Sequence, residues 1–312
     1  MRVGWGVLFL AALAAGSGCG NGAASAESAK ADLDSDPLAL LPPAAVFVAR
    51  LDARAIYASK GAGAPIAGLI DAFLPLGDDA GMNPSKDIDA IVVGGYGLTG
   101  PDVVAVMQGQ FDPEAIERTR QTRTGAGIAK GRYDGFTTYD LRSCLLAPLT
   151  HRTMIAGTPD GLRRALDRVQ DGKFEPPAPW IRDALTANWA KVALAGDFAS
   201  QPLSAASVGP VRVPWLQGMR AVQVLADFEP PGLKVSARLS YADPDQAQTA
   251  AQGLRLLDGW LKVFAPLVGG VRVQNLDVTT QASDLACTFA VNEETLRMAL
   301  SLIPRLKQAP PQ

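Results

Sequence analysis

The sequence is poor in the residues that most often carry catalysis or bind metals. Its 312 residues include one histidine, His151, and three cysteines. A single imidazole excludes a metal site built from several histidines and any proton relay that needs two of them. The formal net charge is only −2, so there is no basic excess to release counterions from phosphates. We therefore expect no nucleic-acid partner, cofactor or metal, and we assign no catalytic residue.

Long apolar runs are also scarce, and the one at the N-terminus is short. Met1 and Arg2 precede an apolar stretch from Val7 to Ala15, which is shorter than the roughly 20 residues that cross a membrane. Basic, apolar and small-residue zones in this order are typical of a secretory signal. We predict a signal peptide over residues 1–18. Every later apolar segment is interrupted by a charge, proline or glycine, so the rest is expected to be exported without spanning a membrane.

The end of this segment, Gly16-Ser17-Gly18-Cys19, resembles the signal of bacterial lipoproteins. That family usually has leucine where this chain has Gly16, so the alternatives are secretion without a lipid and a segment that is retained as an anchor. The resemblance implies a diacylglyceryl group on Cys19 and an acyl group on its amino terminus, and two or more chains anchor a protein stably. Because Gly20 rather than aspartate follows, it also implies the outer membrane of the cell envelope, facing the periplasm or the surface.

Residues 19–37 are small and polar, without apolar periodicity. This composition predicts a flexible tether that spans on the order of 25 Å as a coil. Residues 308–312, at the other end, are predicted to be a disordered tail.

The chain between them repeats itself. Residues 156–166 share five of eleven positions with residues 290–300 at an offset of 134. Asp112-Pro113 similarly recurs as Asp243-Pro244. We predict a duplication with copy 1 over residues 38–175 and copy 2 over residues 176–307, separated at a proline-rich stretch.

Each copy is predicted to contain strands, hairpins and capped helices. The predicted fold is α+β, with two tandem copies of an antiparallel sheet and helices on one face. Proline after Asp112, Thr158 and Asp243 marks three helix starts. The predicted strands and helices are 45–51, 65–74 (helix), 88–93, 103–108, 113–123 (helix), 135–146, 150–155, 159–169 (helix), 192–198, 219–227, 233–241, 244–264 (helix), 271–281, 285–291 and a helix capped by Asn292.

The longest helix predicts a covered sheet face. An apolar stripe at three- and four-residue spacing is typical of core packing, and a lipid or partner groove is the alternative. The stripe consists of Ala247, Ala250, Leu254, Leu257, Leu261 and Phe264. The body from Leu41-Pro-Pro-Ala-Ala-Val46 onward also resembles uncharacterised bacterial exported proteins with tandem α+β repeats, and this implies no activity.

Two patterns invite a chemical interpretation. Gly95-Tyr96-Gly97-Leu98-Thr99-Gly100 spells G-x-G-x-x-G, but a proline and a β-rich run follow instead of a helix, so we predict a hairpin loop. Cys144 and His151 would face each other as a thiol–imidazole pair if Ala147 and Pro148 turned a hairpin. The apolar residues matched to them in copy 2 favour plain packing.

Two further clusters are weaker. Cys144 and Cys287 could form a disulfide in an oxidising compartment, although two buried thiols are the default. The acids Asp78, Asp79, Asp87 and Asp89 suggest calcium, but their spacing differs from that of an EF-hand loop.

These observations favour a non-enzymatic envelope lipoprotein that binds or scaffolds a protein partner. The alternatives are a carrier of a lipid or other apolar ligand and, third, a hydrolase.

Overall fold

The computed structural model describes residues 33–73, 82–97, 102–122, 128–141, 144–172, 174, 178–202, 207–208, 211–212, 216–230, 232–264 and 273–298. The predicted signal peptide, Cys19, Asp78, Asp79 and the predicted tail lie outside these residues.

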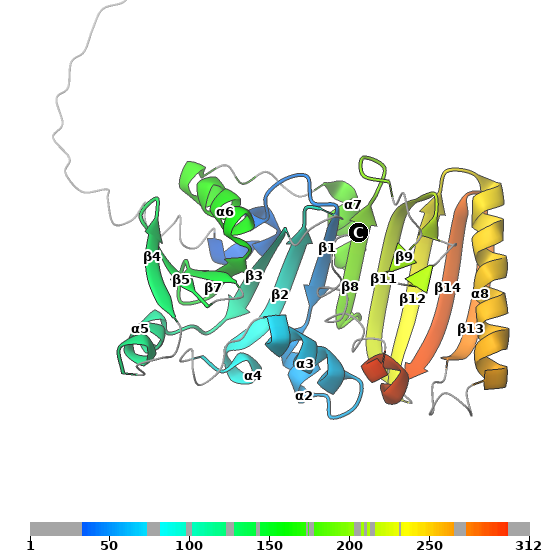
Figure 1. The fold of residues 1–312 in the computed structure, drawn as a ribbon, viewed down its shortest axis with the longest axis horizontal. Coiled ribbons are helices and arrows are strands. Elements are labelled where there is room, and N and C mark those ends of the chain that lie inside the picture. The colour runs from blue at the N-terminus through cyan, green and yellow to red at the C-terminus, as the bar shows by residue number, and fades with distance from the viewer. Residues whose placement is uncertain are drawn as a thin grey trace, which may run out of the picture.

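Twelve strands form one antiparallel sheet in the order β13-β14-β12-β11-β8-β1-β2-β3-β7-β6-β5-β4 (Figure 1). The predicted α+β class is confirmed, but the sheets of the two predicted copies are continuous, because β1 pairs with β8 along its whole length. The strands are β1 Phe47–Leu51, β2 Ile88–Gly95, β3 Val103–Gly109, β4 Ala129–Tyr133, β5 Phe136–Asp140, β6 Leu145–Pro148, β7 Thr153–Gly157, β8 Val192–Asp197, β11 Met219–Glu229, β12 Gly232–Tyr241, β13 Val273–Gln281 and β14 Asp284–Asn292. Two further strands, β9 (Ser207–Val208) and β10 (Val211–Arg212), pair with each other.

The two halves of the sheet follow the same path. Outward from the central pair, β1, β2, β3, β7 and β6 have the same order as β8, β11, β12, β14 and β13. The β4–β5 hairpin extends the first half only. A matching strand order is what a duplication would produce, while the boundary between residues 175 and 176 stays a prediction.

The helices lie on both faces of the sheet, not on one face as predicted. They are α2 Ala53–Ala58, α3 Gly63–Phe73, α4 Pro84–Asp87, α5 Pro113–Thr122, α6 Pro159–Asp171, α7 Pro179–Leu185 and α8 Pro244–Phe264, with a 3-10 turn η1 Pro37–Leu40 and a helical segment at 293–298. Figure 1 shows α8 along the edge strand β13 and α2, α3 and α4 near the middle of the sheet.

We call one surface of the sheet face one. Paired residues on it include Leu51, Val192, Ala226 and Val235 from four successive strands. In the first half this face packs against α2, α3 and α5 through Ile56, Ile66, Ile70 and Ile116, among others. In the second half it packs against the small residues of α8, chiefly Ala247, Ala250 and Ala251. Face one is therefore a core along both halves.

The opposite surface, face two, carries Arg50, Ala193, Leu225 and Ser236 at successive paired positions. Its first half is packed under η1, α6 and α7, which contribute Leu40, Leu162, Leu166, Ile181 and Leu185 to a second core. Its second half, on β12, β13 and β14, is a solvated surface with exposed residues that include Arg238, Asp277, Thr279, Ala286 and Thr288. One solvated face is common in antiparallel sheets.

The predicted apolar stripe of α8 is only partly a packing surface. Ala247 and Ala250 are fully buried and Leu254 is partly buried against the core. Leu257, however, is 38% exposed. The described side chains therefore pack through the amino-terminal half of the stripe, and the side chains of Leu261 and Phe264 lie outside the described residues.

The end of the predicted tether packs on the sheet. Leu33 is buried in the second core, and the Asp34 carboxylate accepts hydrogen bonds from the hydroxyls of Thr150 and Thr153, each at 2.6 Å. Asp36 also pairs with Arg182 at 2.8 Å. Leu33, Asp34 and Asp36 of the predicted tether therefore contact the fold, and residues 19–32 of that prediction lie outside the described residues.

Candidate functional site

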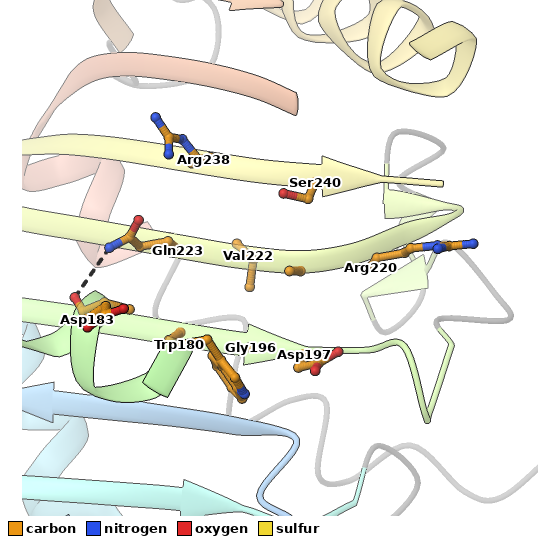
Figure 2. Close-up of a pocket in the computed structure, with 12 residues that line it drawn as sticks. Trp180, Asp183, Gly196, Asp197, Arg220, Val222, Gln223, Arg238 and Ser240 are labelled. Carbon is orange, nitrogen blue, oxygen red and sulfur yellow. Dashed lines mark hydrogen bonds between the residues drawn. The ribbon is translucent and has the colours of Figure 1, made fainter. Parts of the chain in front are cut away.

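A groove of about 580 Å³ lies on face two, where α7 borders the solvated second half of the sheet. Figure 2 shows Trp180 and Asp183 of α7 on one side and Arg238 and Ser240 of β12 on the other. The lining residues are Trp180, Asp183, Ala184, Ala195, Gly196, Asp197, Arg220, Ala221, Val222, Gln223, Arg238 and Ser240.

Helix α7 forms one wall of the groove, because it buries an apolar side in the second core and leaves a more polar side toward the groove. Proline at its first position suits a helix start, and Ile181 and Leu185 are buried in the second core. The other side of the helix is left with Trp180, half-buried, and Asp183, exposed. Gln223 on β11 donates a hydrogen bond from Nε2 to the Ala184 carbonyl at 3.4 Å, so α7 is tied to the groove floor.

The floor consists of alternate residues of β8, β11 and β12. Ala195, Gln223 and Arg238 are directly paired across the three strands, as are Asp197, Ala221 and Ser240. Residues between them point to face one, where Leu239 and Tyr241 are buried. The alternation of polar and apolar residues along β12 therefore produces both the floor and the core beneath it.

The acidic and basic side chains of the groove differ in their hydrogen bonding. Asp197 accepts a hydrogen bond from the Ala199 amide at 2.8 Å, and Asp284, next to the groove, accepts one from the Ser240 hydroxyl at 2.7 Å. Among the residues that the structure describes, the side chains of Arg220 and Arg238 have neither a hydrogen-bond partner nor an ion-pair partner. Both are exposed. Two guanidinium groups with unused N–H donors can bind carboxylates or phosphates.

The thiol–imidazole pair of Cys144 and His151 does not form. Ala147 and Pro148 belong to strand β6, and the turn falls at residues 149–152. His151 lies in this turn, with Nδ1 3.2 Å from the carbonyl oxygen of Phe111. Cys144 directly precedes Leu145, the first residue of β6. The two side chains therefore lie at opposite ends of the strand.

The glycine-rich motif is a hairpin connection between β2 and β3, as predicted. The Tyr96 amide donates to the Asp102 carbonyl at 2.9 Å, and the Tyr96 hydroxyl donates to the Pro42 carbonyl at 3.0 Å. Arg164, paired with Asp102 at 2.7 Å, lies 5.0 Å from the ring centre of Tyr96. Burial of this ring raises the pKa of Tyr96. The motif packs its aromatic residue, and residues 98–101 lie outside the described part of the chain.

The cysteines and the acids do not form sites in the part of the chain that the structure describes. Cys144 packs against the core of the first half and Cys287 belongs to the core under α8, and no disulfide joins them. Asp87 accepts the Asn83 amide at 2.6 Å, and Asp89 pairs with Arg54. No group of three or more metal-binding side chains is found among the described residues.

None of the groove residues was identified from the sequence. Their signal was present, because Arg238 and Ser240 alternate with Leu239 and Tyr241 in the predicted strand. Such alternation indicates one solvated face. It does not indicate that a helix from another part of the chain borders that face.

Comparisons with known proteins show similarity of fold only. No protein-family model and no curated protein matches the sequence. The solved structure of TP0453 in crystal form I has a TM-score of 0.57, with 11% sequence identity over 88% of this chain and 99% of that chain. Crystal form IV of TP0453 has a TM-score of 0.50, with 12% identity over 86% of this chain and 96% of that chain.

Proposed function

We propose that this chain is an exported, lipid-anchored envelope protein that binds a protein partner on the second half of face two and performs no chemistry itself. The anchor rests on the resemblance of the segment ending at Cys19 to a lipoprotein signal. In the described part of the chain, no helix is both long and apolar enough to cross a bilayer.

One observation carries the binding role. Both halves of face one and the first half of face two are packed under helices or the 3-10 turn, whereas the second half of face two is solvated. The groove lies at the border between the packed and solvated halves, with tryptophan and arginine among its lining residues. These two residue types are enriched where protein partners bind most strongly.

A carrier of an apolar ligand has less support from the described residues. Such a carrier would hold its ligand in a largely apolar cavity. The groove instead has Asp183, Asp197, Arg220 and Arg238 among its lining residues.

The anchor is tested by metabolic labelling with palmitate in the native bacterium. We expect the wild-type chain to be labelled and fractionated with membranes, and the Cys19→Ser variant to be unlabelled. If neither chain is labelled, the lipid anchor is contradicted and secretion without a lipid is supported.

The partner surface is tested by site-specific photo-crosslinking in the same cells. The photoreactive residue is placed at Ala286 or Thr288, both exposed on face two, or at the control position Lys86, exposed on α4. We expect a discrete protein adduct from the first two positions only. No adduct at Ala286 or Thr288, or the same adducts at Lys86, would contradict a binding role for this face.

A further inference from the structure

We infer that the partner binds through an acidic, extended segment whose carboxylates pair with Arg238 and Arg220. This inference rests on the proposed function and specifies the chemistry of the partner. It follows from the positions of the two arginines, their lack of partners among the described residues and the small residues around them.

Arg238 stands on a floor of small and polar residues. Gln223 and Ala286 are paired with it on the neighbouring strands, and Ser236 and Ser240 flank it on the same face of β12. None of these side chains carries a charge. The guanidinium can therefore offer a pair of parallel N–H donors to a carboxylate without losing another ion pair.

Arg220 provides a second positive charge along the same groove. It lies at a register shift of β11, between Met219 and Ala221, and is exposed. Arg238 is paired with Gln223, three residues further along β11, so the two arginines are separated by roughly 10 Å along the strand. Two acidic residues of an extended chain can each reach one of these arginines.

The aspartates in and beside the groove form no ion pair with Arg220 or Arg238 in the part of the chain that the structure describes. Asp197 accepts the Ala199 amide and Asp284 accepts the Ser240 hydroxyl, each within the protein. Asp183 lies on the opposite wall, on α7. Trp180, also on α7, adds an aromatic surface to the same wall. The N–H donors of the two guanidinium groups therefore remain available to carboxylates of a partner.

The test uses a fluorescein-labelled octapeptide of alternating glutamate and serine, followed by fluorescence anisotropy at low and high salt. We expect binding to the full-length folded protein that weakens with salt. In the Arg220→Glu/Arg238→Glu double variant we expect binding at least about tenfold weaker, because two attractive contacts become repulsive. Lys86→Glu is the control, since it reverses the charge of a residue that is exposed on α4, outside the proposed binding surface. It should bind within about twofold of wild type.

Three results would overturn the inference. They are no binding of the peptide to the wild-type protein, equal binding to the double variant, and arginine-dependent binding of phosphatidylglycerol vesicles or inorganic phosphate in place of the peptide. Circular dichroism shows whether each variant is folded, and the single variants Arg220→Glu and Arg238→Glu replace the double variant if it is not.

The photo-crosslinking described above separates this inference from the proposed function. An adduct at Ala286 that persists in the double variant contradicts the acidic segment and leaves the binding surface in place. An adduct that is lost with both arginines supports the inference. No adduct in wild-type cells contradicts the proposed function itself.

Discussion

Arg50 of β1 donates a hydrogen bond from Nε to the carbonyl oxygen of Leu185, the last residue of α7, at 3.0 Å. Its Nη2 donates to the carbonyls of Ala187 and Ala190 at 3.0 and 3.1 Å. The last carbonyls of a helix have no partner within the helix, and a cation there is favourable. One side chain in the first half of the sheet thus fixes the wall of a groove in the second half.

The Arg50→Ala variant should lose stability because three carbonyls lose a charged donor. We expect a decrease of about 2–4 kcal/mol in the free energy of unfolding, measured by chemical denaturation. Arg54→Ala is the control, since Arg54 is exposed and pairs with Asp89 at the surface. It should change stability by less than about 0.5 kcal/mol. Equal effects of the two substitutions would contradict the role given to Arg50.

Gly109→Ala should destabilise the sheet at the end of β3. A Cβ atom at Gly109 would lie 1.8 Å from the carbonyl oxygen of Asp87, so the backbones of β2 and β3 would have to separate. At Gly68, on the exposed side of α3, a Cβ would have no atom within 4 Å. We expect a loss of at least about 2 kcal/mol for Gly109→Ala and a gain of about 0.5–1 kcal/mol for Gly68→Ala. Thermal unfolding of both variants checks the difference in sign.

Glu117 should contribute to the loss of stability in acid. Hydrogen bonds from Arg120, then Gln121, lower the pKa of Glu117 from 4.5 to about 2. A carboxyl group whose pKa is lower in the folded than in the unfolded chain stabilises the fold above its unfolded pKa, and that stabilisation is lost as the pH falls from about 4.5 to 2. The melting temperature of Glu117→Gln should therefore fall less steeply over this range. Parallel curves for variant and wild type would contradict the prediction.

The two body cysteines should differ in reactivity. Cys287 is 5% exposed, and burial raises the pKa of its thiol, whereas Cys144 is partly exposed. Because the thiolate is the nucleophile, we expect iodoacetamide to modify Cys144 first and Cys287 only slowly in the folded protein. Mass spectrometry of timed samples measures both rates. Similar rates for the two cysteines in the folded protein would contradict this prediction. In denaturant, where both thiols are exposed, we expect similar rates.

Local signals in the sequence were sufficient to predict where α5, α6 and α8 begin. Asp112 accepts the Glu114 amide at 2.9 Å, and Asp243 accepts the Gln246 amide at 2.9 Å, as expected for residues that precede proline at a helix start. Helix α6 likewise begins after Thr158 and ends at Gly172, which has a left-handed conformation. These features depend on a few adjacent residues.

Strand register could not be obtained from the repeat. At the offset of 134, Ala156 corresponds to Ala290, yet Ala156 lies on face one and Ala290 on face two. The offset aligns the helix starts at Thr158 and Asn292, but the preceding strand has five residues in β7 and nine in β14. A shift of one residue moves a side chain to the other face, so matched identities did not predict which residues face solvent.

The candidate groove could not be predicted from local sequence patterns either. It requires α7, which was not predicted, to pack beside strands β11 and β12, and this arrangement depends on contacts such as Arg50 with Leu185 across 135 positions. No pattern within α7 identifies the sheet that it will border.

The pairing of β1 with β8 joins the two halves of the sheet. Five consecutive residue pairs, from Phe47 with Gly196 to Leu51 with Val192, join the halves. A half expressed alone would present one of these strands as an unpaired edge, which is a template for association with another chain. The covalent link makes this association intramolecular, so the halves stay paired however dilute the protein is. Two separate halves would lack that protection.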